Sequence, residues 1–350
     1  MLANWLLVVF VLAAMLAPAN ALRAFGRRTT VATLSSRRLL SMSAVSYKTG
    51  VMFPGQGAQA VGMAGPLCAE LPEAKALFDK ASEILGYDLL KVCVEGPKEK
   101  LDSTVVAQVA IFVSSMAALE KLKKDDPAAI ESCTVTMGLS LGEYTALCFA
   151  GAFSFEDGVK LTKVRGEAMQ AAADASKSGM VAIVGLDIAT VNAICAEATK
   201  KSGKPIAIAN YLVDGNYAVS GAIEACDAAR EVAPAMGARM AVPLAVAGAF
   251  HTDFMQPAVP SLEKALASVT INTPRIPVIS NVDAKPHTDP ASIRATLAKQ
   301  VTNPVQWETI VSTMVKDPEF AKAYEVGPGT VCRGIVKRFG KKLEVINVSA

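Results

Sequence analysis

A strand, a tight turn and a helix follow one another around residue 140, and this succession most constrains how the chain can fold. Residues 134–137 are rich in β-branched residues and stop at Gly138-Leu-Ser-Leu-Gly142, after which residues 143–149 are expected to be helical. An apolar strand at 50–54 likewise runs into a glycine-rich turn. Helical spacing of apolar residues follows at 66–85 and 104–124. Repeated strand, turn and helix units predict an α/β fold with a largely parallel sheet.

Residues 178–244 follow a different pattern, which predicts a second, smaller domain. The expected elements are strands at 180–185, 206–212, 216–220 and 239–246, and helices at 188–201 and 223–236. This β-α-β-β-α-β order is the ferredoxin-like pattern. Because the pattern ends shortly before His251, we expect the small domain to be an insertion. The remaining parts, 47–177 and 245–350, are expected to form one large α/β-hydrolase-like domain.

The first 46 residues have the features of a targeting address. An apolar run of 13 residues, 5–17, is too short to span a bilayer and is followed by Ala-Asn-Ala, so residues 1–21 fit a signal peptide. Residues 22–46 contain five Arg, five Ser, three Thr and no acid, which is typical of an organelle transit peptide. A signal followed by a transit segment predicts the plastid (chloroplast) stroma. A plain secretory signal with a disordered tail and a mitochondrial presequence are the alternatives.

The leader also carries the positive charge of the chain. The whole chain has a net charge of +3, but residues 47–350 contain 30 basic and 32 acidic residues. This near-neutral remainder argues against a nucleic-acid partner, and we expect no membrane association of the mature form. Seven cysteines without a CxxC pair lie mostly in apolar stretches, which predicts buried free thiols in a reducing compartment. With only two histidines, no metal site is predicted.

The turn at residues 138–142 matches the nucleophile-elbow pattern G-x-S-x-G, which makes Ser140 a candidate nucleophile. The two glycines let a sharp turn expose the hydroxyl, and the N-terminus of the following helix favours a developing oxyanion. A serine at its ordinary pKa needs a base. His251 follows an expected strand, whereas His287 lies in a polar turn, so we expect His251 to be the base.

Seven motifs follow one another along the chain: FPGQGAQ (53–59), GLSLGEY (138–144), RGEAMQ (165–170), GAFHT (248–252), SNV (280–282), QVTNPVQW (300–307) and EVGPG (325–329). In this order they resemble the motifs of the malonyl-CoA:acyl carrier protein transacylase family of type II fatty acid synthesis. The resemblance covers nearly all of residues 48–348. Leu139 stands where many members have His before the serine, and plant-type plastid members are similar in having Leu there.

The resemblance implies a role for each residue of a serine–histidine site. Ser140 would be the nucleophile and His251 its base, with the backbone carbonyl of Gln300 orienting the imidazole in place of an Asp. From the sequence alone, Gln300 is equally well explained as an ordinary amide at a helix end. The backbone amides of Gln56 and Leu141 would form the oxyanion hole.

Two groups of cations are candidates for binding, the first implied by the resemblance and the second suggested by its spacing in the sequence. Arg165 would bind the free carboxylate of a malonyl thioester, because a guanidinium pairs with a carboxylate in a bidentate manner. Without the surrounding motif, Arg165 would be taken for a surface residue of a helix. Arg333, Lys337, Arg338, Lys341 and Lys342 place three charges on one helix face with the spacing i, i+4, i+8. That face would dock the acidic carrier protein, or else be a solvated helix end.

The activity implied is ping-pong transfer of a malonyl group from malonyl-CoA to acyl carrier protein. The phosphopantetheine thiol belongs to the partner, so the chain itself would need no cofactor, and we expect it to be a monomer. The alternatives are a serine thioesterase or esterase of related chemistry, and a non-catalytic module that binds the carrier protein.

Overall fold

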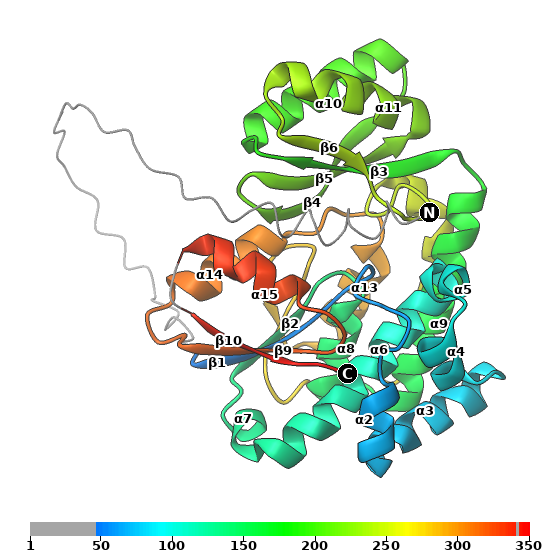
Figure 1. Cartoon of the computed structure of the whole chain (residues 1–350), viewed down its shortest axis with the longest axis vertical. Helices are drawn as coiled ribbons and strands as arrows, with labels where there is room; N and C mark the ends of the chain where they lie inside the picture. Colours follow the sequence, from blue (N-terminus) through cyan, green and yellow to red (C-terminus); the bar gives the residue numbers. More distant parts are fainter. Residues whose placement is uncertain (1–46, 341–342) are drawn as a thin grey trace, which may run out of the picture. The chain divides into compact units, whose positions relative to one another are not determined.

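A five-residue apolar strand, β1, starts a six-stranded sheet with the strand order β10-β9-β1-β2-β7-β8 (Figure 1). The structure is a computed structural model that describes residues 47–340 and 343–350. The predicted signal and transit peptides, and Lys341 and Lys342, lie outside the described residues. Neighbouring strands from β10 to β7 pair in parallel, and β8 pairs antiparallel with β7. The strands are β1 (Thr49–Phe53), β2 (Val135–Gly138), β7 (Val278–Ile279), β8 (Pro286–His287), β9 (Lys322–Val326) and β10 (Glu344–Val348).

Helices alternate with most of these strands along the chain, which agrees with the predicted α/β fold. The helical spacing predicted over 66–85 is confirmed but belongs to two helices, because Leu71 is extended and Pro72 starts a new helix. Proline lacks an N–H and disfavours helical geometry in the residue before it. The helices are α2 (Gly65–Glu70), α3 (Pro72–Leu85), α4 (Leu89–Glu95), α5 (Lys98–Asp102), α6 (Thr104–Asp125), α7 (Pro127–Glu131), α8 (Gly142–Phe149), α9 (Phe155–Asp174), α12 (Val259–Ala267), α13 (Pro290–Gln300), α14 (Trp307–Lys316) and α15 (Val331–Val336), with 3-10 turns at Asp253–Ala258 and Lys337–Phe339.

The six-stranded sheet has a hydrophobic core on each face. Val51 and Phe53 of β1 pack into the core that contains α6 and α8, whereas Met52 packs into the core that contains α14 and α15. Successive side chains of a strand point to opposite faces, so a strand that is buried on both faces reads as a continuous apolar run. This double burial fixes the sheet between two layers of helices.

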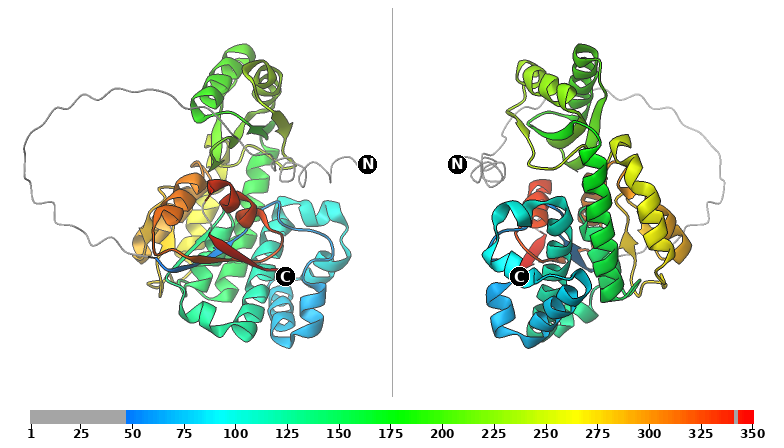
Figure 2. Two further views of the ribbon diagram at one scale, coloured as in Figure 1. Left: turned by 60° about the vertical axis from the view of Figure 1, so that its left-hand side comes forward. Right: turned by 90° about the vertical axis from the view of Figure 1, so that its right-hand side faces the viewer.

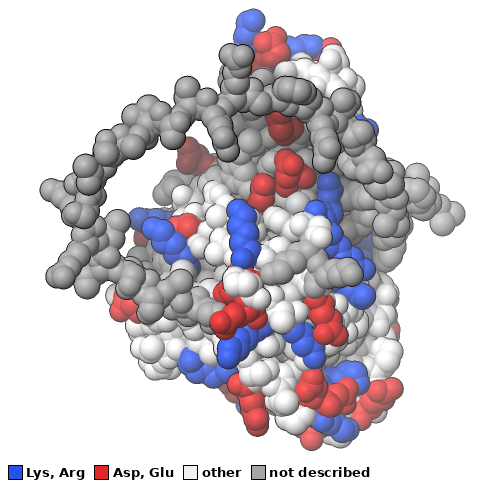
Figure 3. Space-filling model, turned by 90° about the vertical axis from the view of Figure 1, so that its left-hand side faces the viewer, with Lys and Arg blue, Asp and Glu red and all other residues white. Residues whose placement is uncertain are grey.

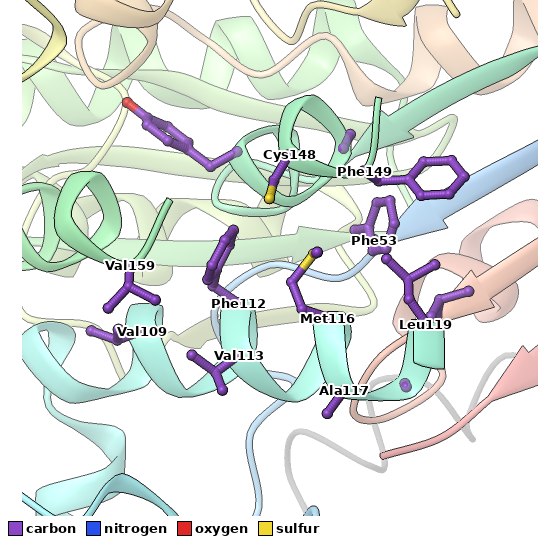
Figure 4. Close-up of a cluster of buried hydrophobic side chains, with 14 of the residues drawn as sticks. Phe53, Val109, Phe112, Val113, Met116, Ala117, Leu119, Cys148, Phe149 and Val159 are labelled. Carbon is purple, nitrogen blue, oxygen red and sulfur yellow. The ribbon is translucent and has the colours of Figure 1, made fainter. Parts of the chain in front are cut away.

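Helix α6 runs through the larger of these cores. Its best window has a mean hydropathy of 1.6, enough for a membrane span, but 83% of that window is buried inside the protein. Figure 4 shows Phe112 and Met116 of α6 pointing toward Cys148 of α8 and the neighbouring Phe149 and Phe53. The helix is therefore the core helix of this domain. All seven cysteines are buried and free, which confirms the prediction of buried thiols.

Residues 178–243 form a separate four-stranded antiparallel sheet with the strand order β4-β5-β3-β6 (Figure 2). Helices α10 and α11 pack against one face of it, and the other face packs against α9 and the segment before α12. The last expected helix is shorter than predicted, because Pro234 changes it to a 3-10 turn, Ala233–Met236. The elements are β3 (Ser178–Val184), α10 (Ile188–Ser202), β4 (Ile206–Val213), β5 (Asn216–Ala222), α11 (Ile223–Val232) and β6 (Met240–Pro243).

Candidate active site

Ser140 lies in the sharp turn between β2 and α8 and has a left-handed backbone, with φ of 52°. The turn is tight enough that a Cβ at Gly138 would overlap the backbone of Gly142. A Cβ at Gly142 would in turn overlap the carbonyl oxygen of Phe53 in β1. Both glycines of the pattern are therefore required by close backbone approach, as expected for a nucleophile elbow.

The candidate site lies where neighbouring parallel strands end at one edge of the six-stranded sheet. The loop with Gln56 follows β1, Ser140 and Leu141 follow β2, and Asn281 follows β7. In open α/β sheets, ligands bind outside the carboxyl ends of the strands. The topology thus gathers residues from three distant segments of the sequence at one place.

The structure brings Ser140 and His251 together. The Oγ of Ser140 lies 2.8 Å from Nε2 of His251, and the Nδ1 of His251 lies 3.0 Å from the carbonyl oxygen of Gln300. Because a carbonyl oxygen can only accept, we assign the ring proton to Nδ1, which leaves Nε2 as the acceptor for the serine hydroxyl. His287, by contrast, contacts the carboxylate of Asp283 at 3.1 Å.

The second sheet holds the loop that carries His251. The Oγ of Ser178 accepts from the backbone N–H of Ala249 at 3.0 Å, and Ser220 Oγ donates to the carbonyl oxygen of Phe250 at 2.9 Å. His251 itself has a left-handed backbone, with φ of 61°. A non-glycine residue in that region costs free energy and persists only where its surroundings hold it. The imidazole is therefore positioned by β3 and β5.

His251 is buried, and its environment favours the neutral imidazole. Burial, and secondly the positive charge of Arg165, together lower the pKa of His251 to about 4, although the hydrogen bond to the Gln300 carbonyl acts in the opposite direction. A neutral imidazole can accept the proton of the Ser140 hydroxyl. The site therefore holds its base in the proton-accepting form at neutral pH.

Arg165 of α9 is 1% exposed, so the alternative that it is a surface residue is wrong. Its NH1 donates to Gln108 Oε1 at 2.6 Å, and its NH2 donates to Gln300 Oε1 at 2.8 Å and Ser140 Oγ at 3.1 Å. Its Nε has no hydrogen-bond partner among the described residues. Burial lowers the pKa of Arg165, but a guanidinium stays charged in proteins. The guanidinium thus presents a buried positive charge directly beside the candidate nucleophile.

Three residues of the site received no role from the sequence. Asn281 fixes the elbow, because its Oδ1 accepts from Ser140 N at 2.6 Å and its Nδ2 donates to Gly138 O at 2.7 Å. Glu143 is 3% exposed and accepts from the backbone N–H of Asn281 at 3.0 Å. Burial raises the pKa of Glu143, although its hydrogen bonds act in the opposite direction. The sequence signal for Gln108 is a lone amide in the apolar helix α6. No pattern in the neighbouring sequence indicates the contacts of Asn281 and Glu143.

The backbone amides of Gln56 and Leu141 lie on two loops that touch. A Cβ at Gly55 would overlap the carbonyl oxygen of Leu139, so the two loops pack backbone against backbone. Neither N–H donates a hydrogen bond within the part of the chain that the structure describes. Leu141 lies at the N-terminal end of α8, where the amides point out of the helix. Both amides are therefore available to a negatively charged oxygen.

The C-terminal cations do not form one helix face. Helix α15 ends at Val336, a 3-10 turn follows, and Gly340 ends it with φ of 70°, so the expected i, i+4, i+8 stripe is wrong. Burial lowers the pKa of Arg338, with Arg239 contributing in the same direction. Figure 3 shows acidic and basic side chains interspersed on the uncovered part of one face. Arg333, Lys337 and Arg338 remain close in sequence without a shared helical stripe.

A serine on a strained strand-to-helix turn, paired with a neutral histidine, is the arrangement of enzymes that pass through an acyl-serine intermediate. Residues 51–348 match the acyl transferase domain model, and the chain belongs to this family.

Two relatives align with most of the chain. The mitochondrial malonyl-CoA-acyl carrier protein transacylase of Mus musculus is 42% identical over 296 residues, which cover 82% of this chain and 77% of that protein. The malonyl CoA-acyl carrier protein transacylase of Bacillus subtilis is 37% identical over 302 residues, with coverages of 86% and 93%.

Solved structures agree with this assignment. The acyl carrier protein S-malonyltransferase of Vibrio cholerae has a TM-score of 0.80 at 37% identity and covers 86% of this chain and 96% of that one. A malonyl-transacylase in complex with a type II PKS acyl-carrier protein has a TM-score of 0.80 at 32% identity, with coverages of 87% and 96%. The chain is therefore similar over its described length to malonyl transferases with mixed α/β folds.

Proposed function

We propose that this chain transfers the malonyl group of malonyl-CoA to the phosphopantetheine thiol of acyl carrier protein and so supplies fatty acid synthesis. The observation that carries this function is the Ser140–His251 pair at 2.8 Å beside the buried guanidinium of Arg165. A serine nucleophile provides acyl transfer, and the fixed cation selects an acyl group with its own carboxylate. The names of the relatives support the same substrate and acceptor.

In the first half-reaction, His251 Nε2 takes the proton of the Ser140 hydroxyl while Oγ attacks the thioester carbonyl. The tetrahedral oxyanion is stabilised by the backbone amides of Gln56 and Leu141. As the intermediate collapses, the C–S bond breaks, and the CoA sulfur takes the proton from His251 to leave as a thiol. Ser140 then carries the malonyl ester.

In the second half-reaction, His251 takes the proton of the phosphopantetheine thiol as its sulfur attacks the malonyl ester. The same two amides stabilise the second oxyanion, and the proton returns to Ser140 Oγ as the C–O bond breaks. The carbonyl oxygen of Gln300 keeps the proton of His251 on Nδ1 throughout. No step calls on a bound cofactor or metal.

Arg165 binds the malonyl carboxylate during both half-reactions in this proposal. Within the described part of the chain, its Nε has no partner, and its contact with Ser140 Oγ is replaceable, so donors are available to the carboxylate of the substrate. A buried charge pair of this kind favours malonyl over acetyl thioesters, because an acetyl group leaves the guanidinium without its anion.

Transfer to carrier protein against hydrolysis is the experiment that tests the function. With malonyl-CoA and holo acyl carrier protein, we expect malonyl-carrier protein to form much faster than free malonate, measured by mass spectrometry of the carrier and by malonate release. Release of malonate at the higher rate would indicate the thioesterase or esterase alternative. Binding of the carrier protein without either product would indicate the non-catalytic module.

We also propose that residues 178–244 form a ferredoxin-like domain inserted into an α/β-hydrolase-like domain of residues 47–177 and 245–350. The strand order β4-β5-β3-β6, with α10 and α11 against one face, supports this assignment. Docking of the carrier protein on Arg333, Lys337, Arg338 and Lys341, and a monomeric state, stay predictions.

We further propose that residues 1–46 direct the chain to the plastid stroma, from the signal-like run followed by an Arg- and Ser-rich segment without acids. Residues 1–46 fused to a fluorescent protein are expected to reach the plastid of an alga with plastids of secondary origin. A matched fusion of residues 22–46 alone should not enter the secretory route. Relatives from mouse, fly and human carry mitochondrial names, so fluorescence in mitochondria, or in the medium, would overturn the proposal.

A further inference from the structure

The side chain of Gln300 contacts more of the site than its backbone does. Its Oε1 accepts from Arg165 NH2 at 2.8 Å, and its Nε2 donates to Ser140 O at 2.9 Å and to Glu143 Oε2 at 2.6 Å. Gln300 is fully buried, and these contacts use the amide oxygen and both N–H groups. Its backbone carbonyl meanwhile accepts from His251. One residue therefore links the nucleophile, the base and the buried cation.

These partners fix which way the amide points. The flipped amide would turn its N–H groups toward the guanidinium, which can only donate, and its oxygen toward the carboxylate of Glu143, which accepts. Asn281 N donates to the same oxygen of Glu143 at 3.0 Å, so this oxygen receives two donors. The Gln300 amide thus lies between Arg165 and Glu143 in a single orientation.

The amide also separates the buried cation from the nearest buried acid. The three hydrogen bonds of Arg165 go to uncharged oxygens, those of Gln108, Gln300 and Ser140. A carboxylate in direct contact would pair with the guanidinium in a strong charge-assisted hydrogen bond and compete with the carboxylate of a substrate. Glu143, at the far end of the amide, is close enough to favour the charged guanidinium without occupying it.

We propose that the side chain of Gln300 is a specificity-determining positioning residue. It holds Glu143 one amide away from Arg165, so that the guanidinium has only uncharged partners among the residues that the structure describes and can still pair with a substrate carboxylate. This inference rests on the proposed function and deepens it, since it explains how a buried arginine stays available to a short acyl group that ends in an acid. Without this separation, a carboxylate of the protein would pair with the guanidinium of Arg165 and compete with the substrate.

The test exchanges the two side chains in the full-length mature enzyme. The double variant Glu143→Gln/Gln300→Glu keeps the buried composition and charge but places the carboxylate next to Arg165. We expect its ratio of malonyl to acetyl loading on Ser140, measured by mass spectrometry, to fall roughly 10- to 100-fold, the range for one charge-assisted hydrogen bond. The backbone carbonyl of residue 300 still faces His251, so labelling of Ser140 by a neutral sulfonyl fluoride should fall less.

Each outcome decides the inference. The single variant Glu143→Gln, which keeps an oxygen acceptor for Gln300 and leaves the amide beside Arg165, is the matched control and should largely keep the malonyl preference. An unchanged ratio in the double variant would overturn the inference, as would equal losses of malonyl loading, acetyl loading and sulfonyl labelling. If the double variant does not fold, Gln300→Glu alone makes the same measurement. Failure of the wild-type enzyme to load malonyl would instead overturn the proposed function.

Discussion

Replacement of Ser140 by alanine is expected to lower malonyl transfer by roughly 10⁴-fold or more, the scale seen when a serine nucleophile is removed. The variant keeps His251, Arg165 and the two amides of the oxyanion hole, but no oxygen remains to accept the malonyl group. Intact-protein mass spectrometry after exposure to malonyl-CoA should show a malonyl adduct on the wild-type enzyme and none on Ser140→Ala. Steady-state transfer to the carrier protein measures the loss in rate.

Substitution of a serine outside the site is the control for Ser140→Ala, because it tests whether loss of a serine hydroxyl alone affects the enzyme. Ser268 is exposed at the end of α12, and its Oγ donates to Ala265 O at 2.7 Å, far in sequence from the elbow. Ser268→Ala should keep both the adduct and the rate. Ser140→Ala should unfold at a temperature close to that of the wild type, because alanine and serine meet the same backbone strain at φ of 52°. A malonyl adduct that persists in Ser140→Ala would move the nucleophile to another residue.

Much of the fold follows from patterns that are local in the sequence. The apolar run of β1, the β-branched residues before Gly138 and the helical spacing over residues 104–124 each act through near neighbours. The hairpin between β4 and β5 is marked by Asp214-Gly215, where Gly215 has φ of 77°. Boundaries were less predictable, because Pro72 divides the helical spacing over residues 66–85 between two helices.

The candidate site divides in the same way. Ser140 could be found because the elbow needs Gly138 and Gly142 at fixed offsets, and His251 because few bases were available. The side chain of Gln300 meets Glu143 across 157 positions of the sequence, and Asn281 meets Ser140 across 141. Such contacts arise only when β2, β7 and α13 have been placed beside one another, so no local pattern could predict them.

Replacement of Arg165 by alanine is expected to reduce malonyl loading far more than acetyl loading. Truncating one partner of a buried charge pair costs about 2–5 kcal/mol, which is roughly 30-fold or more in kcat/KM for malonyl-CoA. Acetyl-CoA has no carboxylate to lose, so its kcat/KM should change little by comparison. Arg230→Ala is the matched control, since Arg230 is exposed and pairs with Asp227 at 3.2 Å. Equal losses for both acyl groups would remove Arg165 from substrate selection.

The same variant should change the pH dependence of the base. Burial first, and the charge of Arg165 second, lower the pKa of His251 to about 4. His251 must be neutral to accept the Ser140 proton, so kcat/KM of the wild type should fall on the acid side near pH 4 instead of near the ordinary histidine value of about 6.5.

Removing the cation of Arg165 takes away the second cause, so in Arg165→Ala the acid limb should move upward but stay below that ordinary value.

A malonyl carboxylate bound to Arg165 offsets the same charge. For malonyl-CoA, the acid limb of kcat should therefore lie above that of kcat/KM, whereas the two should nearly coincide for acetyl-CoA. The pH profiles of wild type and Arg165→Ala should be compared with acetyl-CoA and with a neutral sulfonyl fluoride, because neither reagent has a carboxylate that binds Arg165. An acid limb that stays at the same pH in Arg165→Ala would show that the guanidinium does not act on His251. In that case the low pKa would arise from burial alone, and the malonyl carboxylate could not strengthen the base that activates Ser140.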